Sequence, residues 1–142
     1  MGKREISAII IFFLITKASF AQDAIEKNIE PGMYVKLTPC KIGSQYISMD
    51  VYTKTRFNAN EKPSIDSTTG EGLFEYFFKP GDFDASRLPC TYGNKSYRVA
   101  SLHLLPSQDG NEKRVMLLYT ADPYKIIWVE FDKAVELEEI SW

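Results

Sequence analysis

Two cysteines, Cys40 and Cys90, place the strongest constraint on how this chain of 142 residues can fold. An even number of cysteines in an exported chain is most simply explained by one disulfide. Closing a loop of 50 residues (90 − 40) stabilises a fold by about 4 kcal/mol in chain-entropy theory. The alternative, a redox-active pair, normally uses close Cys-x-x-Cys spacing, which this chain lacks. We therefore predict a structural disulfide between Cys40 and Cys90.

The first 21 residues have the pattern of a secretory signal peptide. Lys3 and Arg4 precede an apolar run at residues 6–15, and small residues stand at the −3 and −1 positions of a cleavage site after Ala21. The apolar run is shorter than the roughly 20 residues that a membrane-spanning helix needs. We predict a signal peptide over residues 1–21 and a periplasmic or secreted location.

The remaining residues, 22–142, have the length of one domain. Cleavage after residue 21 leaves 14 basic and 18 acidic side chains, a net charge of −4. Nucleic acids and anionic membrane surfaces require clustered lysine and arginine, which this chain does not have. We expect no nucleic-acid partner and no stable membrane insertion.

Residues 88–105 are expected to organise the fold. They contain Cys90, the turn pair Gly93-Asn94 and His103, the one histidine of the chain. Residues 96–105 carry apolar and small side chains on both faces, which is typical of a strand inside a sheet. Gly93-Asn94 predicts a tight hairpin, because glycine accepts the positive φ that such turns need.

Five other segments are predicted to be strands. Alternation of apolar and polar residues indicates strands at 33–37 and 45–57, and two further strands are expected at 113–120 and 124–132. Segment 73–79 fits either a helix or a strand, and its aromatic richness favours a strand. We predict a mainly β fold, a small single-domain antiparallel sheet of about six strands, as a curled sheet, a barrel or a sandwich.

The faces of two of these strands can be assigned. In segment 45–57 we expect one buried face and one solvated face. The buried face would carry Ile47, Met49, Val51 and Phe57, and the solvated face Tyr46, Ser48, Asp50, Tyr52, Lys54 and Arg56. In segment 124–132, Ile126 and Trp128 share one face and Ile127 and Val129 the other, so this strand should be covered on both sides.

Two groups of residues are candidates for contact with a partner. Tyr52 and Arg56 belong to a solvated face that combines tyrosines with cations, which are enriched at binding hot spots. The alternative is ordinary cross-strand pairing. Residues 80–89 read as a compact turn that presents Phe83 between Asp82 and Asp84. Phe83 would either contact a partner or fold back onto the core.

The polar segment 58–72 is expected to be a long mobile loop.

Residues suited to catalysis or metal binding are scarce. Ser101 and His103 fall on one strand face, but side chains two apart stand side by side and not in the attack geometry of a nucleophile and base. The members of the carboxylate pairs Asp82/Asp84 and Glu130/Asp132 are close together in the chain. The two carboxylates of a glycosidase come from separate elements on the two sides of a cleft. We expect no catalytic residue, no metal and no cofactor, and hence not an enzyme.

Three classes of function remain open. The first, which we favour, is an exported inhibitor or immunity protein that binds and blocks a cell-wall-degrading or toxic enzyme. The second is an envelope accessory or a glycan- or ligand-binding module. The third is a small hydrolase. A compact, acidic domain with one disulfide fits the first class.

Overall fold

The computed structural model describes residues 29–56, 65–66 and 68–142. The predicted signal peptide and most of the loop expected at 58–72 lie outside these residues. No helix in the described part of the chain is long and apolar enough to cross a membrane.

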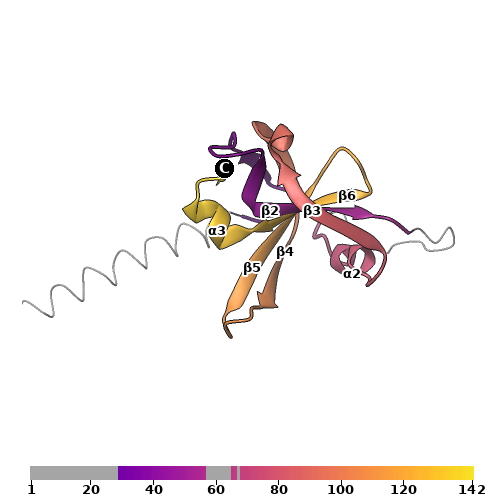
Figure 1. Cartoon of the computed structure of the whole chain (residues 1–142). Coiled ribbons are helices and arrows are strands. Elements are labelled where there is room, and N and C mark those ends of the chain that lie inside the picture. The colour runs from indigo at the N-terminus through magenta and orange to yellow at the C-terminus, as the bar shows by residue number, and fades with distance from the viewer. Residues whose placement is uncertain (1–28, 57–64, 67) are drawn as a thin grey trace, which may run out of the picture.

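One antiparallel sheet of seven strands, curled into a half-barrel, forms the body of the protein (Figure 1). Its spatial order is β3-β2-β6-β5-β4-β1-β7. The strands are β1 (Tyr34–Leu37), β2 (Gln45–Lys54), β3 (Phe83–Pro89), β4 (Lys95–Pro106), β5 (Glu112–Tyr119), β6 (Lys125–Glu130) and β7 (Ile140–Ser141). The predicted fold class is confirmed, and the curled sheet is the architecture adopted. Five of the six predicted strands are present.

The sheet buries side chains on both of its faces. One face packs on α3 (Phe131–Glu136), and we call it the α3 face; the other packs on α2 (Leu73–Phe77), the α2 face. Strand β6 lies inside the sheet, with Ile127 and Val129 in the α3-face core and Ile126 and Trp128 in the α2-face core. The predicted burial of both faces of this strand is therefore confirmed.

The strand predicted at residues 73–79 is wrong, because this segment forms the helix α2. A strand would have placed Glu75 on the same face as Leu73 and Phe77. The helix buries Leu73 and Phe77 against the sheet and leaves Glu75 exposed. Burying the Glu75 carboxylate, as a strand would require, costs free energy, and this favours the helix over the strand.

The compact turn predicted at residues 80–89 is also wrong. Most of it is the edge strand β3, which pairs with β2 from Lys54↔Phe83 to Asp50↔Arg87. Four consecutive residues of β3, at 84–87, are exposed. An edge strand with little buried surface shows no hydrophobic alternation, so its sequence resembles that of a loop.

No hairpin forms at Gly93-Asn94. The turn joins the short 3₁₀ helix η1 (Cys90–Tyr92) to β4, and β4 pairs with β5 and β1. The positive φ, 58°, occurs at Asn94, while Gly93 has φ −73°. A Cβ atom at Gly93 would collide with the hydroxyl oxygen of Tyr46. Glycine is needed here for close approach, and not for an unusual φ.

The predicted faces of β2 are reversed in its first half. Tyr46 and Ser48 are buried and Ile47 is exposed, whereas Met49 and Val51 are buried as predicted. The register with β3 shifts between Gln45 and Asp50. From Gln45 to Asp50, β2 advances five residues and its partners in β3 advance only two, so β2 contains three extra residues. An odd number of extra residues exchanges the faces on the two sides of this bulge. At the end of β2, Lys54, predicted to be solvated, is buried, and its Nζ donates to Tyr76 O (2.8 Å).

Candidate functional site

The disulfide Cys40–Cys90 is present and joins the loop between β1 and β2 to η1. The two Cα atoms are 5.6 Å apart. This confirms the predicted pairing, and such a bond is compatible with an extracellular or periplasmic protein.

The loop at residues 38–44, here called the disulfide loop, is held at both of its ends. At its start, Thr38 N donates to Glu139 O (3.0 Å) and Thr38 Oγ1 donates to Glu138 O (2.7 Å). The Tyr46 hydroxyl donates to Thr38 O. At its end, Cys90 N donates to Ser44 O (2.9 Å). These contacts and the disulfide fix the loop on the body of the protein.

The disulfide loop carries an exposed apolar side chain. Ile42 is 78% exposed, and Ile47, at the start of β2, is 45% exposed. Both residues border a small cleft of about 90 Å³. The cleft is lined by Pro39, Cys40, Lys41, Ile42, Gln45, Ile47, Leu137 and Glu139, and we call these residues the disulfide-loop surface. Lys41 Nζ and Glu138 Oε2, 3.0 Å apart, form an ion pair on this side of the molecule.

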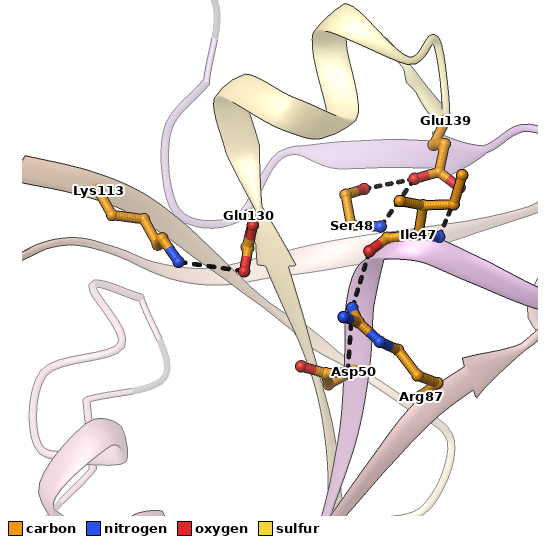
Figure 2. A network of polar contacts seen from close by, with 7 residues as sticks. All are labelled: Ile47, Ser48, Asp50, Arg87, Lys113, Glu130 and Glu139. Carbon is orange, nitrogen blue, oxygen red and sulfur yellow. Dashed lines mark hydrogen bonds and ion pairs between the residues drawn. The ribbon is translucent and has the colours of Figure 1, made fainter. Parts of the chain in front are cut away.

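Two charged side chains hold the backbone of Ile47 in place, as Figure 2 shows. The Glu139 carboxylate accepts hydrogen bonds from Ile47 N (3.1 Å), Ser48 N (2.9 Å) and Ser48 Oγ (2.6 Å). Arg87 Nη1 donates to Ile47 O (2.7 Å) and lies 3.5 Å from Asp50 Oδ1. The backbone polar groups of Ile47 in the bulge of β2 are thereby paired with side chains, and the backbone from which the exposed Ile47 side chain projects is held in place.

A row of charges continues from this network across the sheet. Asp50 lies between Arg87 and the pair formed by Glu130 and Lys113 (Nζ–Oε1 3.2 Å). Burial raises the pKa of Asp50, the Arg87 guanidinium opposes that rise, and the Glu130 carboxylate adds to it. Glu130 pairs with Lys113, whereas Asp132 pairs with Arg114. The carboxylate pair considered from the sequence is therefore divided between two cations.

The five residues predicted to contact a partner come together at one corner of the sheet, at the far end of β2. Asp84 pairs in register with Thr53, and Thr55 N donates to Asp82 O (2.8 Å). The rings of Tyr52 and Phe83 lie 5.4 Å apart, and both contact Phe78. Phe83 thus folds back onto other aromatic side chains. Arg56 and Asp84 are the exposed members of this group.

Ser101 and His103 form a contact that the sequence argument did not foresee. His103 Nε2 lies 2.8 Å from Ser101 Oγ, within hydrogen-bond distance. Ser101 is only 4% exposed, and Gly70 packs closely against the neighbouring backbone. The His103 ring stacks on Phe74 (4.7 Å between centroids). Such burial suits a structural hydrogen bond more than attack on a substrate.

The pH dependence of stability should report on this histidine. Burial lowers the pKa of His103, and the Glu75 carboxylate partly opposes this. The stability that the neutral imidazole contributes is complete above the unfolded pKa of about 6.5. It is lost as the pH falls below that value, because the unfolded chain takes up the proton first. We expect wild-type protein to lose more stability than His103→Gln between pH 7.5 and 5.5, measured by urea unfolding.

Ser101→Ala is the matched control for this prediction. It removes the hydrogen bond but keeps the imidazole, so its pH dependence should resemble that of the wild type. Titration of Asp50 has the opposite sign and is common to all three proteins, so it cancels in the comparison. Equal pH dependence in wild type and His103→Gln would contradict the assignment.

Within the described ranges, no group of three or more histidine, cysteine or carboxylate side chains could hold a metal ion. Comparisons with protein-family models, with curated proteins and with solved structures find no match to this chain.

The disulfide-loop surface was not predicted from the sequence. Its signal was Ile42, an apolar residue placed between Lys41 and Gly43 in a turn next to a disulfide cysteine.

Proposed function

We propose that this protein is exported and acts by binding another protein through the disulfide-loop surface. The observation that supports this most is the exposed Ile42 on a loop that is fixed at both ends. A loop whose backbone is already held in place loses little conformational freedom on association, so more of its contact energy appears as affinity. A rigid apolar protrusion next to a shallow cleft is suited to a hollow in a partner.

The favoured partner is a cell-wall-degrading or toxic enzyme that the protein blocks, as an inhibitor or immunity protein would. A protrusion such as Ile42 fits the concave shape that is usual for enzyme active sites. The net charge of −4 expected for residues 22–142 would speed encounter with a cationic partner, and salt would reduce that effect. In this proposal the protein works by occupancy and not by catalysis.

The periplasmic or secreted location belongs to the same proposal. It is supported by the signal-peptide pattern of residues 1–21 and by the disulfide. The corner predicted from the sequence, with Arg56 and Asp84 exposed, is the second surface to test. Its aromatic members, Tyr52 and Phe83, contact other rings and offer less free surface.

The test is capture of envelope proteins on the immobilised protein, followed by affinity and activity measurements on any captured enzyme. We expect inhibition of that enzyme, and a loss of affinity of tenfold or more for Ile42→Glu. Because Ile42 is largely exposed, this change should leave stability within about 0.5 kcal/mol of the wild type. Ile42→Val is the control and should keep most of the affinity.

Asp84→Lys separates the two surfaces. Loss of binding in Asp84→Lys with full binding by Ile42→Glu would move the contact to the corner of β2 and β3. Capture of glycans or of an assembly subunit, with no enzyme inhibited, would favour the accessory module and reject the inhibitor.

A further inference from the structure

A second, larger cavity lies on the α3 face, beside β4, β5 and α3. Strands β4 and β5 project together from the rest of the fold (Figure 1). Its volume is about 410 Å³, within the roughly 300–1,000 Å³ of small-molecule sites. It is lined by Ile29, Leu102, His103, Leu104, Arg114, Val115 and Phe131. None of these residues belongs to the disulfide-loop surface.

Most of this lining is apolar, and part of it is open to solvent. Leu102 is 41% exposed and Leu104 is 61% exposed, although both lie in a regular strand. Leu102 pairs in register with Met116 and Leu104 with Arg114. Directly paired residues share a face of the sheet, so the two leucines and Arg114 form one side of the cavity. Phe131, the first residue of α3, contributes another side.

Arg114 is the charged group of the cavity, and its position is fixed. Its Nη2 donates to Asp132 Oδ1 (2.8 Å) and its Nε to Asp132 Oδ2 (3.4 Å). Its guanidinium carbon lies 5.8 Å from the centre of the Phe131 ring. A guanidinium group has five N–H donors, so Asp132 leaves three that no other described residue takes up.

We propose that this cavity binds a medium-chain aliphatic carboxylate. The chain lies along Leu102, Leu104 and Phe131, and the carboxylate accepts hydrogen bonds from the donors of Arg114 that Asp132 does not use. A cavity of about 410 Å³ that is partly open to solvent lies in the size range of small-molecule sites, and this suits a ligand of the size of decanoate or dodecanoate. The nearby Asp132 carboxylate opposes a second anion. Apolar contact therefore supplies most of the affinity, and Arg114 selects the head group.

The experiment is isothermal titration of the purified protein with decanoate, hexanoate and decanol. Decanoate should bind at least tenfold more tightly than hexanoate, because four methylene groups fewer leave much of the apolar lining uncovered. It should also bind more tightly than decanol, which lacks the charge that Arg114 recognises. Leu104→Glu, at an exposed position, should weaken decanoate binding at least tenfold while the melting temperature stays close to that of the wild type. Arg114→Gln should remove the preference for decanoate over decanol.

Ile42→Glu is the control, because it alters the other surface and should bind decanoate as the wild type does. Absence of decanoate binding would overturn the proposal. Unchanged binding in Leu104→Glu would place the ligand elsewhere and overturn it too. Equal affinity for decanoate and decanol in the wild type would reject the role of Arg114 and with it the carboxylate as ligand class. None of these results depends on capture of a protein partner, so this inference and the proposed function can fail separately.

Discussion

Replacing both Cys40 and Cys90 with serine is expected to lower the free energy of unfolding by about 4 kcal/mol, from the entropy that a closed loop of 50 residues removes from the unfolded chain. Single domains are stable by only 5–15 kcal/mol, so the double variant would lose a large part of its total stability. Urea unfolding of wild type and double variant at neutral pH measures the difference.

Wild-type protein unfolded in the presence of a reductant is the control for this prediction. It should match the double variant, because both lack the cross-link while the rest of the chain is the same. A difference below about 1 kcal/mol between oxidised and reduced wild type would show that the unfolded chain is already restricted near Cys40 and Cys90, or that the native bond is strained.

The same change tests how the disulfide loop is held. Thr38, Ser44 and Tyr46 keep their hydrogen bonds when the disulfide is absent. The loop should then remain in place but move more, so binding to a partner should weaken without being lost. Complete loss of binding in a folded double variant would mean that the disulfide alone holds the loop that carries Ile42 in place.

Much of this fold follows from patterns that are visible along the chain. Strand β6 was predictable because both of its faces are buried, so each side chain of Ile126, Ile127 and Val129 reports on one face. The disulfide was predictable because two cysteines allow a single pairing. The local pattern of apolar residues was sufficient to predict β6, and the number of cysteines was sufficient to predict the disulfide.

The errors arose where contacts between distant residues decide the conformation. The bulge of β2 is stabilised by Glu139, about 90 residues away along the chain, and no local pattern in residues 45–50 reveals it. Gly93 is required by the hydroxyl group of Tyr46, which approaches it in space. Strand β3 is defined by its pairing with β2, because few of its own side chains are buried.

The candidate site was predictable only in part for the same reason. The sequence drew attention to Tyr52 and Phe83, whose ring faces are used by other aromatic side chains in the fold. The sequence did not point to Ile42 or Leu104, because the exposure of a side chain depends on whether distant parts of the chain pack against it. An apolar side chain is expected to be buried until the packing around it is known.

Glu139→Ala is expected to cost about 3 kcal/mol of stability, the largest effect we expect from a single substitution of a charged residue in this protein. Three hydrogen bonds end on its carboxylate, two of them from backbone N–H groups in the bulge of β2. Ser48 is fully buried in the native fold, so its N–H and hydroxyl groups would lose the acceptor that they have there. An unsatisfied buried donor costs about 1–3 kcal/mol, while Ile47 N, on the exposed side, would cost less.

Glu139→Gln separates hydrogen bonding from the presence of a side chain. The amide keeps one oxygen acceptor, so we expect a loss of about half that of Glu139→Ala, measured by urea unfolding. Ser48→Ala removes one donor and should make Glu139→Ala less costly, which a double-mutant cycle detects as coupling of about 1 kcal/mol. Because Glu139 also holds Ile47 beside Ile42 in the disulfide-loop surface, Glu139→Ala should weaken partner binding as well as stability. A loss below about 1 kcal/mol, with no coupling to Ser48, would mean that the bulge finds other acceptors and that Glu139 does not hold this surface in place.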